Sequence, residues 1–555
     1  MVENIENPAR SRPEDRVVEI CRDLIRIDTT NRGGNVSVGE PEAAEYCARL
    51  MTEAGMTPRF FESAPGRVSV VGHLPGWDPE APGLVIHGHT DVVPAEADEW
   101  SVDPFGAELK DGMIWGRGAV DMKGMDAMVL AVLLHLARTG RRPRRPLTVA
   151  FFADEEAGGV YGARWVVDHH PEVFDGCTEA ISEVGGFSTE VHGSRAYLVQ
   201  TAEKGLAWLN LTAEGAPGHG SAPHPDNAVT RLAGAMTRIG GHEWPLVYTK
   251  TTRALLEQVA EIMGVDFDET DPTPQLDALG QARSWVAGTL RTSSNPTGLT
   301  AGYKHNVIPS SATGTVDVRL IPGEEESALA TIAELAGPDV TIAPEHRDVA
   351  LETPFSGDLV ELMIASLQAE DPEAQVLPFM LGGGTDNKSL SRLGITGYGF
   401  APMRLPADLA FTSLFHGIDE RVPVDALEFG CRVLERMLEP RLRGSAGSRP
   451  RASPGGASSS GAPRRGSARS AAAPIGRTPR APRGAAGRRR GTRGGRPSSP
   501  GTPTSVRGRS RRGSRTSAVH APAHPGRRRR VRRPVPYGPP LAASPATGLP
   551  FTHEL

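Results

Sequence analysis

The sequence predicts an α/β protein built on a mostly parallel sheet, with a smaller α+β domain inserted into it and a disordered C-terminal tail. Three observations support this prediction. Apolar runs alternate with helical patterns over residues 13–195, residues 196–345 follow a different order of elements, and the composition changes abruptly after residue 440. The first domain is therefore expected at 13–195 and 346–440, the inserted domain at 196–345 and the tail at 441–555.

The first domain begins with two amphipathic helices, expected at Pro13–Ile27 and Pro41–Ala54, the second ended by Gly55. Apolar runs typical of buried strands then alternate with helical stretches. The expected strands are Leu84–Ile86, Leu147–Ala153 and Ala180–Ile181, and the expected helices are Met122–Leu136 and Ala163–Asp168. Strands that alternate with helices form βαβ units, whose strands are parallel.

Residues 196–345 predict the order β-α-β-β-α-β of a ferredoxin-like unit, with an extra helical stretch near 250–263. The expected elements are, in this order, Leu206–Leu211, Asp226–Ile239, Ser284–Arg291, Thr313–Leu320, Glu324–Leu335 and Val340–Ala343. This segment is interpreted as a second domain, after which the first domain resumes.

The body and the tail carry opposite charges. From Arg441 onward the chain has 26 Arg, no Lys and one acidic residue, Glu554, whereas residues 1–440 have a net charge of −30. The tail consists mainly of Arg, Gly, Ala, Ser and Pro and has little apolar surface to bury, so we expect it to be disordered. A nucleic-acid-binding arm is one interpretation, but stacking aromatics are absent apart from Tyr537. Translation of a GC-rich reading frame out of register is the favoured interpretation.

The N-terminal residues and the cysteines bear on location. The first sixteen residues are polar and carry charges of both signs, so no secretory signal is expected and a cytoplasmic protein without a membrane partner is predicted. The cysteines form no CxxC pair, which argues against a thiolate zinc site or a disulfide framework. Ordinary buried thiols are expected at Cys21, Cys47, Cys177 and Cys431.

Each apolar strand of the first domain is followed by residues that bind metals in other proteins. The strings are HGHTD, DEE and SEVGG, and a later string near the end of the body is HGIDER. In open α/β sheets, ligands bind beyond the carboxyl ends of the strands, so these side chains should converge. The candidates are His89, Asp91, Asp121, Glu155, Glu156, Glu183 and His416.

Imidazole and carboxylate ligands without thiolate favour Zn²⁺, Co²⁺ or Mn²⁺. Two His and three carboxylates can hold two metals if one carboxylate bridges them, and such a pair can activate a water and polarise a carbonyl. A further carboxylate must then accept the proton of that water, and Glu155 and Glu156 offer one residue for each task. Neighbours on an extended segment point in opposite directions, so a turn is required there.

Five strings together resemble a known family. HGHTDVVP, GRGAVDMKG, ADEEAGG, ISEVGG and HGIDER, in this order, resemble the di-zinc metallopeptidase family of glutamate carboxypeptidase, aminoacylase, acetylornithine deacetylase and succinyl-diaminopimelate desuccinylase. The resemblance spans about residues 13–440. It implies a zinc-peptidase catalytic domain with two Zn²⁺ per subunit.

The resemblance also implies roles for the candidates. His89 and Glu183 would bind one zinc, Glu156 and His416 the second, and Asp121 would bridge them. Asp91 is similar to the carboxylate that orients the first imidazole, and Glu155 to the general base. Glu at position 183 is similar to carboxypeptidases and deacylases, whereas aminopeptidases and dipeptidases tend to have Asp.

The inserted domain resembles the lid and dimerisation domain of that family. In KGLAWLNLTAEGAPGHGSAPHPDNAV, His219 is implied as an oxyanion donor in a partner subunit's site, although a surface imidazole remains possible. NVIPSSATGTVDVRLIPG resembles the segment that supplies Asn306 and Arg319, the latter as a clamp on a substrate carboxylate; a structural ion pair is the alternative. GGGTDNKSL resembles the loop that lines the substrate pocket with Gly383 and Thr385, although glycine there can equally serve the turn.

Together these features predict a homodimeric two-zinc hydrolase that cleaves an amide bond next to a free carboxylate, in an N-acyl amino acid or a short peptide. A di-zinc dipeptidase or aminopeptidase is the first alternative, and it would demand a free α-amine. A nucleic-acid-binding protein acting through the basic tail is more remote. A serine hydrolase is disfavoured because GHGSAP around Ser221 is not a GxSxG elbow.

Overall fold

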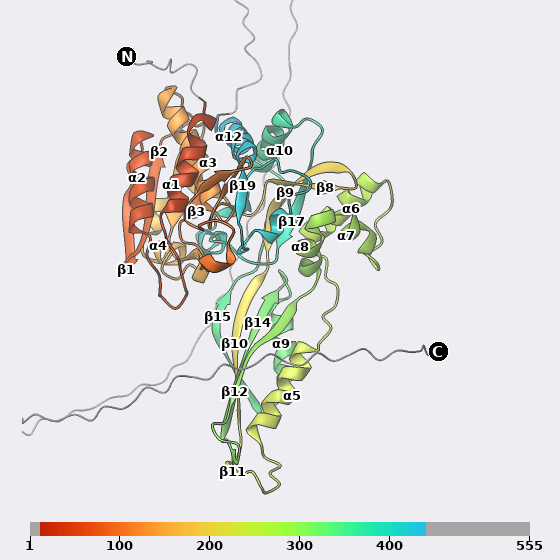
Figure 1. Ribbon diagram of the computed structural model, residues 1–555. Helices are drawn as coiled ribbons and strands as arrows, with labels where there is room; N and C mark the ends of the chain where they lie inside the picture. Colours follow the sequence, from red (N-terminus) through yellow and green to blue (C-terminus); the bar gives the residue numbers. More distant parts are fainter. Residues whose placement is uncertain (1–11, 440–555) are drawn as a thin grey trace, which may run out of the picture. The chain divides into compact units, whose positions relative to one another are not determined.

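The computed structural model describes residues 12–439, and the structural statements below refer to that part of the chain. The tail expected at 441–555 lies outside the described residues. Residues 12–439 form a large mixed sheet, a separate four-stranded sheet and two small sheets, with helices packed against them (Figure 1).

The three predicted strands lie side by side in the large sheet. Its order is β1-β2-β6-β3-β7-β18-β9-β16, and β8 and β17 also pair with β9. The strands are β1 (Arg59–Ala64), β2 (Arg67–Leu74), β3 (Gly83–His89), β6 (Leu147–Phe152), β7 (Cys177–Ser182), β8 (Phe187–Val191), β9 (Ser194–Glu203), β16 (Leu351–Glu352), β17 (Gln375–Leu381) and β18 (Thr396–Gly399). β3 pairs in parallel with both β6 and β7. Every residue of β3 and β6 is buried, which explains why these strands are continuous apolar runs rather than alternating ones.

The large sheet is less parallel than predicted. Besides β3, parallel pairing joins β18 to β7 and β17 to β9, but β1, β2 and β6 pair antiparallel, as do β8, β16 and β18 with β9. The expectation of a mostly parallel sheet is therefore wrong for the outer strands. Short connections such as those between β1 and β2 and between β8 and β9 allow only hairpins, because a parallel crossover needs a dozen or more residues.

Helices cover both faces of the large sheet. The helices of this part are α1 (Glu14–Arg26), α2 (Pro41–Glu53), α3 (Lys123–Arg138), α4 (Ala163–His169), α10 (Asp358–Glu370), α11 (Asn387–Ser391) and α12 (Val424–Leu438). Leu84 and Ile86 of β3 share a core with α1, α3 and α12, whereas Val85 shares a second core with α4 and α11. Successive strand residues point to opposite faces, so each face has its own core. Helices α1, α2, α3 and α4 confirm the helices expected from the sequence.

The second sheet is antiparallel and has the order β12-β14-β10-β15. Its elements follow the chain order β10 (Gly205–Glu214), α5 (Ala228–Gly240), β12 (Ser293–Ala301), β14 (Ser311–Leu320), α9 (Glu325–Ala336) and β15 (Val340–Asp348). β10 alternates between buried and more exposed residues because α5 and α9 cover one face of the sheet. The short strands β11 (Gly218–His219) and β13 (Val307–Ile308) pair at the end of this sheet (Figure 1). The role of this part as a lid and dimerisation domain stays a prediction.

The strand expected at Ser284–Arg291 is wrong. These residues form α8 (Arg283–Ala287) and a 3-10 turn at Gly288–Leu290, and the strand begins at Ser293. Val286 and Leu290 are both buried and lie four residues apart, which is helical spacing. A short apolar stretch of this kind does not distinguish a helix from a strand. The extra helical stretch is confirmed as α6 (Lys250–Met263), and α7 (Thr273–Ala278) follows it.

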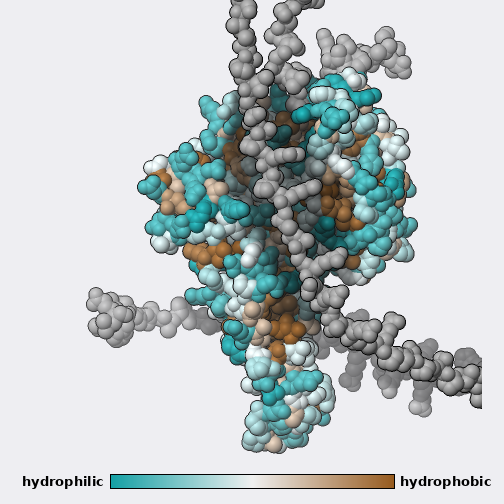
Figure 2. All heavy atoms as spheres, turned by 180° about the vertical axis from the view of Figure 1, so that it is seen from behind, coloured by the Kyte–Doolittle hydropathy of each residue, from teal (hydrophilic) through white to brown (hydrophobic). Residues whose placement is uncertain are grey.

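The surface and the cysteines agree with the composition. Hydrophilic residues cover much of the face seen in Figure 2, and hydrophobic residues gather in patches on it. No helix within residues 12–439 is both long and apolar enough to cross a membrane. Cys21, Cys47 and Cys431 are buried free thiols, as expected, whereas Cys177 is a free thiol that is only half-buried.

Candidate metal centre

The candidate ligands come together at the carboxyl ends of the central strands. His89 is the last residue of β3 and is 1% exposed. Glu155 and Glu156 follow β6, and Glu183 follows β7 directly. Parallel pairing of the three strands places these residues at one edge of the sheet, where the sequence predicts them.

Asp121 lies between two imidazoles. Its Oδ1 is 3.1 Å from Nε2 of His89, and its Oδ2 is 3.2 Å from Nε2 of His416. Glu183 Oε2 is 3.6 Å from the His89 nitrogen, and Glu156 Oε2 is 3.0 Å from the His416 nitrogen. We call His89, Asp121 and Glu183 the first ligand set and Asp121, Glu156 and His416 the second.

Both sets fit a divalent cation. Ligands that bind Zn²⁺ tetrahedrally at about 2.0–2.1 Å lie roughly 3.3 Å apart, and the imidazole-to-carboxylate separations of the two sets, 3.0–3.6 Å, are close to this value. The donors are imidazole nitrogens and carboxylate oxygens, and no thiolate is among them. A carboxylate with one oxygen toward each set is the arrangement that a pair of cations requires.

Glu155 stands beside the first set. Its Oε2 is 4.0 Å from Nε2 of His89, farther than the oxygens of Asp121 and Glu183. Glu155 and Glu156 lie on a 3-10 turn, Glu155–Ala157, so both side chains reach the centre. The turn that the sequence requires is therefore present.

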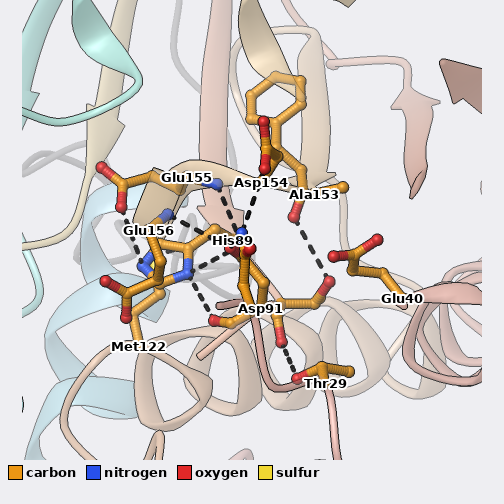
Figure 3. A network of polar contacts seen from close by, with 12 residues as sticks. Thr29, Glu40, His89, Asp91, Met122, Ala153, Asp154, Glu155 and Glu156 are labelled. Carbon is orange, nitrogen blue, oxygen red and sulfur yellow. Dashed lines mark hydrogen bonds and ion pairs between the residues drawn. The ribbon is translucent and has the colours of Figure 1, made fainter. Parts of the chain in front are cut away.

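The carboxylate of Asp91 supports this turn (Figure 3). It accepts hydrogen bonds from the main-chain N–H of Glu155 at 3.1 Å and of Glu156 at 3.2 Å, and from Nδ2 of Asn31 at 2.8 Å. Nδ1 of His89 lies 2.9 Å from the main-chain oxygen of Asp91 but 3.6 Å from its carboxylate. The expected orientation of the imidazole is thus made mainly by the backbone of Asp91.

Asp154, just before the turn, has a left-handed backbone with φ of 67°. Its carboxylate accepts hydrogen bonds from the N–H of Tyr161 at 2.8 Å and from Asn31 at 3.1 Å, and it contacts the buried guanidinium of Arg67. Arg67 in turn lies 2.8 Å from the carboxylate of Glu40, which is also near Asp91 in Figure 3. These supporting residues were missed by the sequence analysis.

Burial and mutual repulsion raise the pKa of the carboxylates around the centre. Burial and then the charge of Asp121 raise the pKa of Glu183 to about 8. Burial and Glu183 raise the pKa of Glu155 well above its usual value, and burial and Asp121 raise the pKa of Glu156. So much negative charge in a buried place favours bound cations.

The pKa values of the two imidazoles are also raised, in their case by the neighbouring carboxylates. Burial alone would lower the pKa of His89, but Glu183 and Asp121 raise it well above its usual value. Hydrogen bonds with Asp121 and Glu156 raise the pKa of His416 to about 10. Burial would raise the pKa of Asp121, but its hydrogen bonds with both imidazoles lower it.

His219 and Asn306 are not brought to this centre. His219 is exposed in β11, and its Nδ1 is 2.8 Å from Oγ of Ser221. The N–H of Gly220 donates to the main-chain oxygen of Asn306 at 3.0 Å, so both residues lie at the two-stranded antiparallel pair of β11 and β13. No hydrogen bond or ion pair within the described part of the chain joins either one to the ligand sets.

Arg319 lies on β14 and pairs with Asp317. Nε and Nη2 of Arg319 donate to the two oxygens of Asp317 at 2.8 and 3.0 Å, and Nε1 of Trp208 donates to the same carboxylate at 3.2 Å. The Arg319 side chain is 32% exposed, so this is not a fully buried ion pair. One edge of the guanidinium remains for another partner.

The loop after β17 is held inside the protein. Thr385 donates through Oγ1 and its main-chain N to Glu203 at 2.6 and 3.0 Å. Gly383 has no positive φ, and a Cβ added there would meet the Leu381 side chain at an ordinary 3.9 Å. The predicted substrate contacts of Thr385 and Gly383 stay predictions. Asp386, in the same string, is 6% exposed, and burial raises its pKa well above the usual value. The charge of Asp386 also raises the pKa of Glu155. Asp386 was not among the predicted site residues, although it is an acidic residue next to Thr385.

Comparison with known proteins identifies the family. A family model described as Peptidase family M20/M25/M40 matches residues 85–440. The chain belongs to this family. The match begins in β3 and includes all the candidate ligands.

Related proteins of this peptidase family cover most of the chain. An N-fatty-acyl-amino acid synthase/hydrolase of Xenopus tropicalis is 28% identical over 448 residues, covering 74% of this chain and 83% of the relative. Aminoacylase-1 of Homo sapiens is 26% identical over 431 residues, covering 76% and 94%.

Solved structures of the M20 family share the fold. An M20 family metallo-carboxypeptidase from Sulfolobus solfataricus gives a TM-score of 0.59 at 18% identity, covering 76% of this chain and 98% of that one. Human carnosine dipeptidase 1 gives 0.55 at 14% identity, covering 77% and 95%. As a member of this peptidase family, the chain is an enzyme that hydrolyses amide or peptide bonds with the help of metal ions.

Proposed function

We propose that this M20 enzyme is a homodimeric hydrolase with two Zn²⁺ per subunit, which cleaves the amide bond of an N-acyl amino acid or short peptide next to a free carboxylate. The observation that carries this proposal is Asp121, whose two oxygens lie 3.1 and 3.2 Å from His89 and His416. Relatives named for N-acyl amino acids support the substrate class.

His89 and Glu183 would hold one cation, Glu156 and His416 would hold the other, and Asp121 would bind both. Co²⁺ or Mn²⁺ would suit the same donors, because ligand type alone does not select among these metals. Bound cations supply polarisation of the scissile carbonyl and lower the pKa of the attacking water.

Glu155 acts as general base and then as general acid. Its carboxylate takes a proton from the attacking water as the new C–O bond forms, and it delivers that proton to the amine nitrogen as the C–N bond breaks. Asp91 keeps Glu155 in place through the main-chain N–H of the turn.

The substrate carboxylate is held by the open edge of Arg319, with Asn306, Gly383 and Thr385 as further contacts. His219 of the partner subunit donates to the developing oxyanion. Because no hydrogen bond or ion pair within residues 12–439 joins His219 to the ligand sets, this assignment requires a second copy of the chain, and a two-fold symmetric dimer supplies one.

The first experiment combines metal analysis with a substrate panel. We expect the wild-type chain to contain two metals and to hydrolyse N-acyl amino acids, and we expect Glu155→Ala to lose activity while keeping both metals. A wild-type chain that stays metal-free and inactive after reconstitution would refute the proposal. Hydrolysis confined to peptides with a free α-amine would instead identify a dipeptidase or aminopeptidase.

Mixed dimers test the role of His219. Neither Glu155→Ala nor His219→Ala homodimers should be active, but a mixed dimer regains one complete site if His219 acts in trans. We therefore expect activity from co-expressed variants and none from either alone. Mixed dimers without activity would exclude the trans assignment.

A further inference from the structure

Two charged residues in the strings that resemble the family have no role in the proposed chemistry. Arg117 belongs to GRGAVDMKG and Glu420 to HGIDER. Arg117 is 3% exposed and Glu420 is fully buried, and neither side chain belongs to a ligand set. Although they are far apart in the sequence, Nη1 of Arg117 lies 2.6 Å from Oε2 of Glu420.

The carboxylate of Glu420 accepts hydrogen bonds from the main chain of the segment that carries Asp121. Its Oε1 accepts from the main-chain N–H of Val120 at 2.7 Å and of Asp121 at 3.1 Å. Its Oε2 accepts from the main-chain N–H of Gly118 at 3.1 Å, in addition to Arg117. Both oxygens are therefore used, and the backbone of Asp121 is one of their donors.

Arg117 also contacts the segment that carries His416, another ligand of the second set. Its Nη2 lies 3.5 Å from the main-chain oxygen of His416 and 3.4 Å from that of Pro94, and its guanidinium lies 5.1 Å from the centre of the Trp100 ring. His416 has a left-handed backbone, with φ of 58°. It precedes Glu420 by four residues, and the N–H of Gly116 donates to the main-chain oxygen of Glu420 at 2.9 Å.

The ion pair thus connects the backbones of two ligands that come from distant segments. We infer that Glu420, together with Arg117, is a positioning residue that fixes Asp121 relative to His416 and thereby sets the affinity of the second ligand set for its cation. The inference rests on the proposed function, because it takes Asp121 and His416 to be ligands. Residues that orient metal ligands in this way typically change metal affinity or activity by about 10- to 100-fold when replaced.

A purely structural ion pair would behave differently. Removing one partner of a buried pair destabilises the fold because a buried charge is left alone. Such a loss lowers the melting temperature, but it leaves the folded chain able to bind both cations as before. Cation affinity, measured on folded protein, therefore separates the two roles.

The test is Glu420→Gln in the full chain. Gln keeps the shape but has one acceptor oxygen and an NH₂ group that faces N–H donors. Metal-free protein is titrated with Co²⁺, and the visible absorption of bound Co²⁺ reports each equivalent. We expect two equivalents in the wild type, and in the variant one equivalent of near wild-type affinity and a second weakened by about 10- to 100-fold.

Two further variants complete the experiment. Arg117→Lys keeps the positive charge but loses the planar fork, so we expect a smaller weakening of the same equivalent. Glu370→Gln is the control, since Glu370 pairs with Arg432 at 2.9 Å and Arg436 at 2.6 Å, away from the ligand sets. It should lower stability and leave both equivalents unchanged.

The outcomes are distinct. Wild-type affinity for both equivalents in Glu420→Gln overturns the inference, and if that variant does not fold, wild-type affinity in Arg117→Lys overturns it. Equal weakening of both equivalents in Glu420→Gln also overturns it. A wild-type chain that binds no Co²⁺ refutes the proposed function itself.

Discussion

Asp91→Asn tests how the proposed base is held. The Asp91 carboxylate accepts hydrogen bonds from the N–H groups of Glu155 and Glu156 and from Asn31, at 2.8–3.2 Å. A carboxamide of the same shape keeps one acceptor oxygen and turns an NH₂ group toward the remaining donors. At least one hydrogen bond to a charged acceptor is lost, which contributes about 1.5–3 kcal/mol.

The loss should appear in catalysis rather than in the first ligand set. A turn released at Glu155 misplaces the carboxylate, and a displacement of about 1 Å costs on the order of 10²-fold in rate. We therefore expect kcat to fall by about that factor with little change in KM. His89 keeps its 2.9 Å contact with the main-chain oxygen of residue 91, so its cation should be retained.

The assay is steady-state hydrolysis of an N-acyl amino acid together with metal analysis of the same sample. Asp98→Asn, on the short helical turn Ala97–Glu99 without buried residues, serves as the control. Unchanged kcat in Asp91→Asn would show that the turn does not need this carboxylate. Loss of the cation of the first set would show that Asp91 acts through His89 instead.

Three other predictions concern the proposed chemistry. Glu155→Gln should lower kcat by about 10²- to 10⁴-fold while metal analysis still finds both cations; a missing cation would make Glu155 a ligand. Chelation should abolish hydrolysis and lower the melting temperature, because cations that bind the native state stabilise it, and added Zn²⁺ should reverse both effects; metal-free protein with full activity would contradict this. Arg319→Lys should raise KM for N-acyl amino acids by roughly 10- to 100-fold, the equivalent of one hydrogen bond to a charged group, but should leave KM for the corresponding methyl esters unchanged. Equal effects on acids and esters would remove Arg319 from carboxylate recognition.

The central strands were predictable because continuous apolar runs alternate with helical stretches along the chain, as in βαβ units. Leu84–Ile86 and Leu147–Ala153 are continuous apolar runs, which parallel strands buried on both faces require. The strand predicted at Ser284–Arg291 was wrong because a short apolar stretch does not distinguish a strand from a buried helix. The antiparallel outer strands were not among the expected strands, so the sheet was predicted to be more parallel than it is.

The ligands themselves were predictable for a related reason. His89 ends its strand and Glu156 and Glu183 follow theirs closely, so strand pairing brings these ligands together, with Glu155 beside them. Their supports were not predictable. Arg67 meets Asp154 across 87 positions, and Arg117 meets Glu420 across 303, so no local spacing joins the partners.

The buried guanidinium groups of Arg67 and Arg117 both contact residues that have a left-handed backbone. Asp154 and His416, beside or within the ligand sets, both have left-handed backbones without being glycine. Each such conformation costs on the order of 1–3 kcal/mol and persists only where neighbouring contacts fix it. Arg67 contacts the side chain of Asp154, and Arg117 lies beside the main-chain oxygen of His416. His89 needs no comparable support because it belongs to a paired strand. Strand pairing therefore fixes His89 directly, whereas Asp154 and His416, which lie on loops, are held by contacts with the buried guanidinium groups of Arg67 and Arg117.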